Sequence, residues 1–324
     1  LRQQPGHAAI AARMLKLPQW LTRLCGAVLC AMLAAAPAPA ADSSPLKVCM
    51  AEGNAPLSYR AAGEARGLEV ALAQAIAAEL GRPLDVVFFE SRYERESSLA
   101  QEVNALLSSG VCELASGYAL FAPDLGAPRR PSARTPDHDG AKPRRERPFV
   151  PLGRLAATRA YYAMAMGVVT REPGMRVDSL ADLQGLRIGA IAGTVAGSAL
   201  LLYRNGALQQ GLVTLSQLED LLAALEAGRF DATLTPLNKY DAYRNAHPDT
   251  HLARAAYVHP VRINLGFVGL ESAPATLAAA SRAIARALAA GDLARWAETA
   301  GVTWIRPEAP DVQPPFSIGS LRIE

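Results

Sequence analysis

Few side chains in this 324-residue chain form a pattern that is typical of catalysis or metal binding. The chain has neither the Gly-x-Ser-x-Gly pattern of a serine hydrolase nor the Gly-Lys-Ser/Thr pattern of a phosphate-binding loop. His247 and His251 have the spacing of two zinc ligands on a helix, and His259 follows, but Pro248 disfavours a helix between them. We therefore predict a surface turn there, no catalytic residues, no metal and no other cofactor.

The N-terminal segment has the features of an export signal. Lys16 and Arg23 precede an uncharged run at residues 24–36, and the A-x-A pattern of a cleavage site follows. At about 1.5 Å per residue this run is too short to cross a bilayer as a helix. We expect residues 1–40 to be an N-terminal extension and signal peptide, cut after Ala40, which leaves a free periplasmic protein without a stable membrane span. An uncleaved N-terminal anchor is the alternative.

Two of the four cysteines, Cys25 and Cys30, fall inside the predicted signal peptide, so the mature chain keeps Cys49 and Cys112. In an oxidising compartment an isolated pair usually forms a disulfide. Such a bond would close a loop of about 64 residues and stabilise the fold by about 4 kcal/mol in the chain-entropy model. Two separate buried thiols are the alternative.

The charge balance disfavours nucleic acid as a partner. The chain has 33 Lys and Arg against 30 Asp and Glu, and four of those bases but none of the acids lie in the first 40 residues. The rest of the chain therefore holds 29 bases against 30 acids, which is not the balance of a nucleic-acid-binding surface.

Hydrophobic periodicity predicts alternating strands and helices in the first half of the mature chain. The predicted elements are a strand at 46–51, a helix at 68–80, a strand at 84–89, a helix at 97–109 and a strand at 112–116. This order is typical of a right-handed βαβαβ unit with a parallel sheet. Residues 121–154 are rich in proline and arginine and predict an irregular insertion.

A second α/β pattern follows the insertion and then returns to the first. It predicts strands at 160–170, 186–192, 230–235 and 262–270, and helices at 197–203, 218–225, 238–246, 274–290 and 293–300. We assign lobe 1 to 46–160, lobe 2 to 161–260, a return to lobe 1 to 261–306, and a surface tail to 307–324. Because the chain crosses between the lobes twice, we expect two hinge crossovers and a ligand cleft at the carboxyl ends of the strands.

Several short stretches occur in an order that matches a known family. They are 55–59 (APLSY), 67–76 (GLEVALAQAI), 180–185 (LADLQG), 188–189 (IG), 192–194 (AGT) and 226–232 (EAGRFDA). In these stretches the chain resembles the family 3 periplasmic solute-binding proteins, whose amino-acid-binding members feed ABC importers. The resemblance implies an α/β, two-lobed periplasmic-binding-protein-like (type II) fold, a small-molecule solute, an ABC permease as partner, and a monomer.

The resemblance also implies ligand-binding positions. Tyr59 matches an aromatic residue that stacks on the ligand, and Gly117 and Ala119 match a turn whose carbonyls receive an amino group. Thr194 matches a threonine at a helix N-terminus that, with nearby backbone N–H groups such as that of Val195, binds a carboxylate. Helix N-termini favour anions in general. A threonine that only caps its helix is the alternative.

Two family positions differ in this chain. The arginine that pairs with the ligand carboxylate is absent from residues 120–124, and Pro236 stands where an aspartate would hold the α-amino group. Asn238 or Asp241 could replace that aspartate. Candidates to replace the arginine are Arg129, Arg130 and Arg159. Because a buried ammonium without a carboxylate is costly, we expect a small polar solute, anionic or amino-acid-like, rather than a standard α-amino acid.

Two other functions stay open. The placement of Cys49 and Cys112 is similar to that in solute-binding-like proteins that accompany periplasmic quinoprotein dehydrogenases, which would make an oxidoreductase the partner. Some proteins of this fold are cyclohexadienyl dehydratases, which need an acid in the cleft. Glu52, Glu69 and Glu90 are the candidates for such an acid, although a solvated loop or helix charge explains each of them better.

Overall fold

The computed structural model describes residues 44–91, 98–315 and 317–321. The predicted signal peptide and its cleavage site at Ala40 lie outside these residues. Within the described ranges, no helix combines the length and the apolar character that crossing a bilayer requires. Strands and helices alternate along most of the chain, so the structure belongs to the α/β class.

The predicted βαβαβ unit is present and forms the centre of lobe 1. Its elements are β1 (Leu46–Ala51), α2 (Leu68–Glu79), β4 (Leu84–Glu90), α3 (Leu99–Ser108) and β5 (Leu114–Ala119). β1 pairs in parallel with both β4 and β5. Two later helices, α7 (Pro274–Ala290) and α8 (Asp292–Ala300), also pack in lobe 1. The hairpin of β2 (Tyr59–Ala61) and β3 (Glu64–Arg66) was not predicted, because its three-residue strands contain no apolar run.

Lobe 2 repeats the alternation of strands and helices. Its elements are η3 (Leu180–Leu183), β10 (Ile188–Ile191), α4 (Val195–Leu202), η4 (Tyr203–Asn205), η5 (Gln209–Gly211), β11 (Leu212–Leu215), α5 (Leu221–Glu226), β12 (Ala232–Pro236) and α6 (Leu237–Ala246). β10 pairs in parallel with β11 and with β12. The sequence prediction missed β11, since its four residues lie between polar turns without a longer apolar run.

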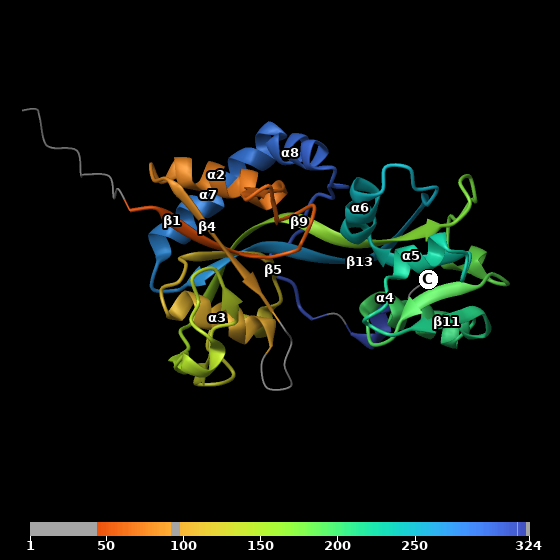
Figure 1. Cartoon of the computed structure of the whole chain (residues 1–324), viewed down its shortest axis with the longest axis horizontal. Helices are drawn as coiled ribbons and strands as arrows, with labels where there is room; N and C mark the ends of the chain where they lie inside the picture. Colours follow the sequence, from red (N-terminus) through yellow and green to blue (C-terminus); the bar gives the residue numbers. More distant parts are fainter. Residues whose placement is uncertain (1–43, 92–97, 316, 322–324) are drawn as a thin grey trace, which may run out of the picture. The chain divides into compact units, whose positions relative to one another are not determined.

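Two long antiparallel strands, β9 (Leu155–Thr170) and β13 (Ala253–Leu270), run from one lobe into the other (Figure 1). They pair with each other and connect all the major strands into one nine-stranded sheet of order β11-β10-β12-β9-β13-β5-β1-β4-β7. The register between β9 and β13 shifts at several points along their length. The two predicted crossings are therefore parts of these continuous strands rather than separate linkers.

Each lobe has its own hydrophobic core on both faces of the sheet. In lobe 1, α2, α7 and α8 cover one face and α3 covers the other (Figure 1). In lobe 2, Val168 of β9 packs on the side of α4, while its neighbour Val169 packs on the side of α5 and α6. Successive residues of a strand face opposite sides, so one strand supplies both cores.

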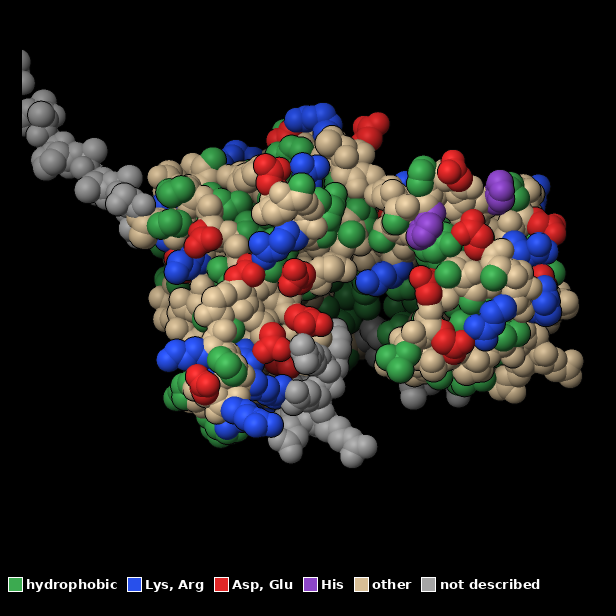
Figure 2. Space-filling view, in the orientation of Figure 1, with side chains coloured by type: hydrophobic (Ala, Val, Ile, Leu, Met, Phe, Trp, Pro, Cys, Tyr) green, Lys and Arg blue, Asp and Glu red, His purple; other side chains and the backbone are tan. Residues whose placement is uncertain are grey.

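The insertion at 121–154 contains short elements that the sequence did not predict. They are η1 (Ala122–Asp124), β6 (Ser132–Ala133), β7 (Asp137–His138), η2 (Arg144–Glu146) and β8 (Val150–Pro151). β7 extends the main sheet by pairing with β4, and the buried Arg147 binds Asp137 and the carbonyl of Pro136. The insertion is thus tied to lobe 1. In Figure 2 blue side chains gather at the corner that this segment occupies.

The predicted surface tail is tied to the fold by hydrogen bonds, while most of its described residues are exposed or half-buried. The side-chain nitrogen of Asn264, on β13, lies 2.8 Å from the carbonyl oxygen of Glu308 and within 3.2 Å of two further tail carbonyls. The last element, η6 (Ile318–Leu321), brings the buried Leu321 into the core of lobe 2. The chain after α8 therefore returns along β13 to lobe 2.

The predicted disulfide between Cys49 and Cys112 is confirmed, with a Cα–Cα distance of 5.7 Å. Cys49 lies in β1 and Cys112 just before β5, and both side chains are buried on the face that α3 covers. The bond therefore fixes two strands of lobe 1.

Candidate functional site

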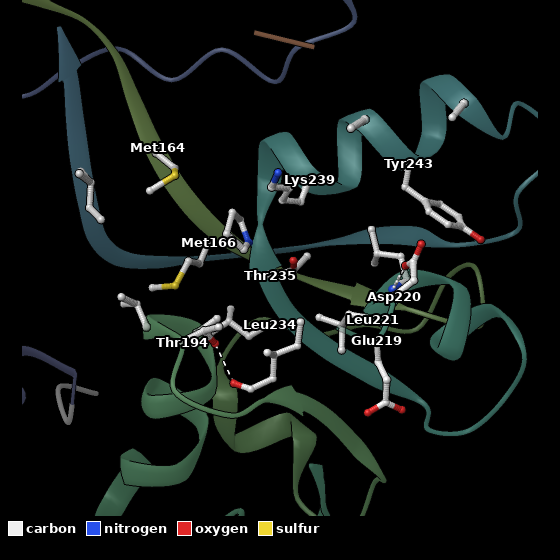
Figure 3. Close-up of a pocket in the computed structure, with 18 of the residues that line it drawn as sticks. Met164, Met166, Thr194, Glu219, Asp220, Leu221, Leu234, Thr235, Lys239 and Tyr243 are labelled. Atoms are coloured by element: carbon white, nitrogen blue, oxygen red, sulfur yellow. Dashed lines mark hydrogen bonds between the residues drawn. The ribbon is translucent and has the colours of Figure 1, made fainter. Parts of the chain in front are cut away.

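A cavity of about 620 Å³ lies in lobe 2, against the two long strands (Figure 3). It opens at the carboxyl ends of β10 and β12, where α/β folds generally bind ligands. Its lining residues are Met164, Met166, Ile191, Thr194, Val195, Ala196, Glu219, Asp220, Leu221, Leu222, Leu234, Thr235, Pro236, Lys239, Ala242, Tyr243, Ala246, His247, Val261 and Ile263. Most of these side chains are apolar. Figure 2 shows green, hydrophobic side chains inside the hollow on the face it presents.

The N-terminus of α4 forms one wall of the cavity. Thr194 is the N-cap residue, and its hydroxyl accepts a hydrogen bond from the backbone N–H of Gly197 (3.0 Å) and donates one to the carbonyl of Ile191 (2.9 Å). Among the described residues, none accepts a hydrogen bond from the backbone N–H of Val195 or Ala196. The hydroxyl of Thr194 is thus committed to capping, while two amide donors at the positive end of the helix remain for an anion.

Two acidic residues line the cavity, and both already have partners. Glu219 accepts hydrogen bonds from Arg229 and from the backbone N–H of Ser216 (2.8 Å each), and these hydrogen bonds hold the pKa of its carboxyl below its usual value. Asp220 caps α5, since one of its oxygens accepts the N–H groups of Leu222 and Ala223 at 3.0 Å. Neither carboxylate is therefore a ready counter-ion for a cation in the cavity.

Lys239 also lines the cavity, and unlike Glu219 and Asp220 it has no partner among the described residues. It lies in the first turn of α6, is exposed, and makes no ion pair or hydrogen bond with any described residue. Figure 3 shows it at the same side of the cavity as Met164 and Met166 of β9. The cavity therefore combines an unpaired cation with hydrocarbon walls.

The histidines form no metal site in the described part of the chain. His247 follows α6 and stacks on Tyr243 with a centroid distance of 4.2 Å, and its Nδ1 lies 3.0 Å from the carbonyl oxygen of that tyrosine. No group of three or more His, Cys, Asp or Glu side chains among the described residues is arranged to hold a metal ion.

The lobe 1 residues named from the sequence do not line this cavity. Tyr59 lines a separate depression of about 350 Å³, with Trp296 among its neighbours. Gly117 and Ala119 lie on β5, where the N–H of Gly117 donates to the hydroxyl of Tyr161 (2.9 Å). Of the six predicted ligand-binding residues, only Thr194 and Val195 meet in one cavity.

A buried carboxyl stands behind Gly117. Glu69, in the first turn of α2, accepts hydrogen bonds from Ser116 and Tyr161 at 2.6 Å each and is inaccessible to solvent. Burial raises the pKa of the Glu69 carboxyl, although its hydrogen bonds act in the opposite direction. The helix start is fixed by Gly67, because a Cβ there would lie 2.2 Å from the carbonyl oxygen of Leu57.

The other candidate acids lie elsewhere. Glu52 and Glu90 are exposed and do not line the lobe 2 cavity. Asp241 is buried and binds the backbone N–H (2.6 Å) and the hydroxyl (2.9 Å) of Thr303, which holds the segment after α8. Asp241 is therefore used in the fold. Asn238 is buried and does not line the cavity.

The arginines proposed as replacement anchors also lie outside the cavity. Arg129 is 3.8 Å from Asp124 and largely exposed, and Arg159 is 3.6 Å from Asp311. Lys239 and Met166, which do line the cavity, were not predicted as ligand-binding residues. The sequence does contain features that could have indicated them. Lys239 follows the carboxyl end of β12 by three residues, and Met166 lies on an apolar strand that runs between the lobes.

Comparison of the structure with solved structures decides the fold. The L-cystine solute receptor of Neisseria gonorrhoeae, in its unliganded open conformation, aligns with 83% of this chain and 97% of its own length, at a TM-score of 0.59 and 18% identity. The second substrate-binding domain of Lactococcus lactis GlnP, also open, aligns with 79% of this chain and 95% of its own length, at 0.57 and 16%. The chain has the two-lobed periplasmic-binding-protein fold.

A third similar structure is the second substrate-binding domain of a putative amino acid ABC transporter from Streptococcus pneumoniae. It aligns with 78% of this chain and 97% of its own length, at a TM-score of 0.55 and 13% identity. No protein-family model and no curated protein matches the chain. At these identities the likeness concerns the fold, and the residues that line the cavity determine which ligand it can bind.

Proposed function

We propose that the chain is a periplasmic solute-binding protein, related to the family 3 amino-acid-binding proteins, that captures a small anionic solute for an ABC importer. The observation that carries the proposal is the pair of N–H groups at Val195 and Ala196, which have no acceptor in the described part of the chain and lie on the wall of a cavity of about 620 Å³. Preformed, largely apolar cavities of this size with a few polar groups are typical ligand sites.

Hinge motion would couple binding to transport. The strands β9 and β13 contribute to both lobes, and Met164, Met166, Val261 and Ile263 of these strands also line the cavity. A solute that contacts these strands and α4 would stabilise one arrangement of the lobes over another. An importer could recognise that arrangement.

Thermal unfolding in the presence of candidate solutes tests the proposal. A solute present at about 100 times its dissociation constant stabilises the folded state by about 2.7 kcal/mol, which raises the unfolding temperature measurably. We expect organic anions to stabilise the protein in a broad screen of amino acids, organic acids and sugars. A screen in which no compound stabilises it would contradict capture and favour the accessory role beside a periplasmic oxidoreductase.

Two variants of Val195 distinguish the contribution of its backbone N–H to binding from that of its side chain. Val195→Pro removes the N–H at the first position of α4, where proline fits a helix, and Val195→Ala keeps the N–H but shortens the side chain. We expect the proline variant to bind an anionic solute more weakly than the alanine variant does. Equal affinities of the two variants would show that the amide does not bind the anion.

A further inference from the structure

The walls of the lobe 2 cavity are mainly hydrocarbon. Met164 and Met166 of β9, Leu234 of β12, Ile263 of β13 and Val195 of α4 contribute apolar atoms from four different elements. A fully hydrophilic solute placed against such walls would lose hydration without gaining hydrogen bonds. The cavity therefore suits a solute with an apolar body, and the polar groups of the lining decide how that body is oriented.

Lys239 occupies a position that folding alone does not favour. It lies in the first turn of α6, where the positive end of the helix dipole repels a cation. No acidic side chain among the described residues pairs with it. An exposed lysine that is unfavourable at this position of the helix and lines a cavity is explained if a ligand supplies the missing negative charge.

The same cavity lacks a place for an ammonium group. Pro236 has neither charge nor a hydrogen-bond donor, and Glu219 is held by Arg229 while Asp220 caps α5. An α-amino group would therefore be desolvated without a free carboxylate partner. For a carboxylate, by contrast, the lining offers the ammonium of Lys239 and the N-terminus of α4.

We propose that this cavity selects a monocarboxylate with an apolar body and no α-ammonium group, and that Lys239 is its counter-ion. This inference rests on the proposed function, because it names the class of solute that the same site would take.

Matched sets of ligands test the selection. Each set keeps one apolar body and changes only the charged groups: 3-phenylpropanoate, phenylalanine and phenethylamine; and 4-methylpentanoate, leucine and 3-methylbutylamine. Titration calorimetry on the mature protein should show that at least one of the two carboxylates binds and that the matching amino acid and amine bind at least about 10-fold more weakly, the scale of one unpaired charge.

A lysine variant tests the counter-ion. Lys239→Met keeps most of the side-chain length and removes the charge, and Lys142→Met makes the same change on the exposed insertion as a matched control. We expect Lys239→Met to weaken binding of the carboxylate by about 10- to 100-fold, the scale of a charge-assisted hydrogen bond. The unfolding temperature of ligand-free Lys239→Met should equal or exceed that of the wild type, while Lys142→Met should keep the wild-type affinity.

The outcomes separate this inference from the proposed function. Tighter binding of an amino acid or an amine than of its matched carboxylate, or an unchanged affinity in Lys239→Met, overturns the inference and leaves solute capture standing. A calorimetric blank for both carboxylates, together with stabilisation by another organic anion in the thermal screen, also overturns the inference alone. A blank in both experiments overturns the two proposals together.

Discussion

The two lobes treat their polar groups differently where they meet β9. In the core of lobe 1, into which β9 brings Tyr161, the side chains of Glu69, Ser116 and Tyr161 and the N–H of Gly117 are hydrogen-bonded to one another. In lobe 2, the amides at the start of α4 and the ammonium of Lys239 face a cavity without partners among the described residues. The contrast indicates that the polar groups of lobe 1 stabilise the fold through their hydrogen bonds, while those of lobe 2 remain available to bind a ligand.

Breaking the disulfide should cause the largest loss of stability in lobe 1. The bond joins Cys49 and Cys112 of lobe 1 across 63 positions, and the Cys49→Ala/Cys112→Ala pair should lower the free energy of unfolding by about 4 kcal/mol. Urea unfolding measures this loss. If lobe 2 holds the ligand site, the doubly substituted protein should keep its solute affinity while folded, and a large loss of affinity would contradict the division between the lobes.

Removing the carboxyl of Glu69 should give the next largest effect. Glu69→Ala leaves the buried hydroxyls of Ser116 and Tyr161 without their acceptor and should cost about 3 kcal/mol of folding free energy. Glu69→Gln is the matched control, since its amide oxygen can still accept one of these hydrogen bonds. A loss below about 1 kcal/mol in urea unfolding of Glu69→Ala would show that the network does not stabilise lobe 1.

The pH dependence of stability tests whether Glu69 is protonated in the folded protein. Burial raises the pKa of this carboxyl in the folded state above its ordinary value of 4.5. The protonated carboxyl is favoured in the folded protein, so its contribution is complete below pH 4.5 and is lost as the pH rises through the folded-state pKa. We expect the stability of the wild type relative to Glu69→Gln to fall with increasing pH in that range. A relative stability that rises with pH would mean that the folded state prefers the ionised carboxylate.

The smallest expected effect concerns the helix cap in lobe 2. Thr194→Ala removes the hydroxyl that caps α4 and should destabilise the protein by about 1 kcal/mol, while Thr194→Ser should retain most of the cap. Because the hydroxyl already bonds to Gly197 and Ile191, its removal should change solute affinity less than Val195→Pro does. A larger loss of affinity in Thr194→Ala would make the hydroxyl a ligand contact.

Much of the fold follows from local patterns in the sequence. The apolar runs at β1, β4 and β12 and the helical spacing in α2 and α3 specify elements that the structure contains. β11 and the β2–β3 hairpin escaped prediction, because three- and four-residue strands are defined by their pairing rather than by a run of their own. The contacts of Asn264 with the tail carbonyls could not be predicted either, because they depend on tertiary structure.

The site was harder to predict than the fold. The resemblance to the family predicted Thr194 and Val195 as ligand-binding residues, and both line the cavity. It also pointed to Tyr59 and Asn238, which do not line it. Lys239 was overlooked because a single lysine on a helix is usually a solvated charge. Only the three-dimensional arrangement shows that Glu219 binds Arg229 and Asp220 caps α5, while Lys239 has no partner among the described residues.

Methionine methyl groups offer the most direct test that the solute binds against lobe 2. Of the four methionines after residue 40, Met164 and Met166 line the cavity, while Met50 lies in the core of lobe 1 and Met175 lies beside the core of lobe 2 away from the lining. In spectra of protein with ¹³C-methyl methionine, a saturating solute found by the thermal screen should shift the signals of Met164 and Met166 and leave that of Met50 nearly unchanged. Saturation with unchanged Met164 and Met166 signals would place the solute elsewhere and contradict the account.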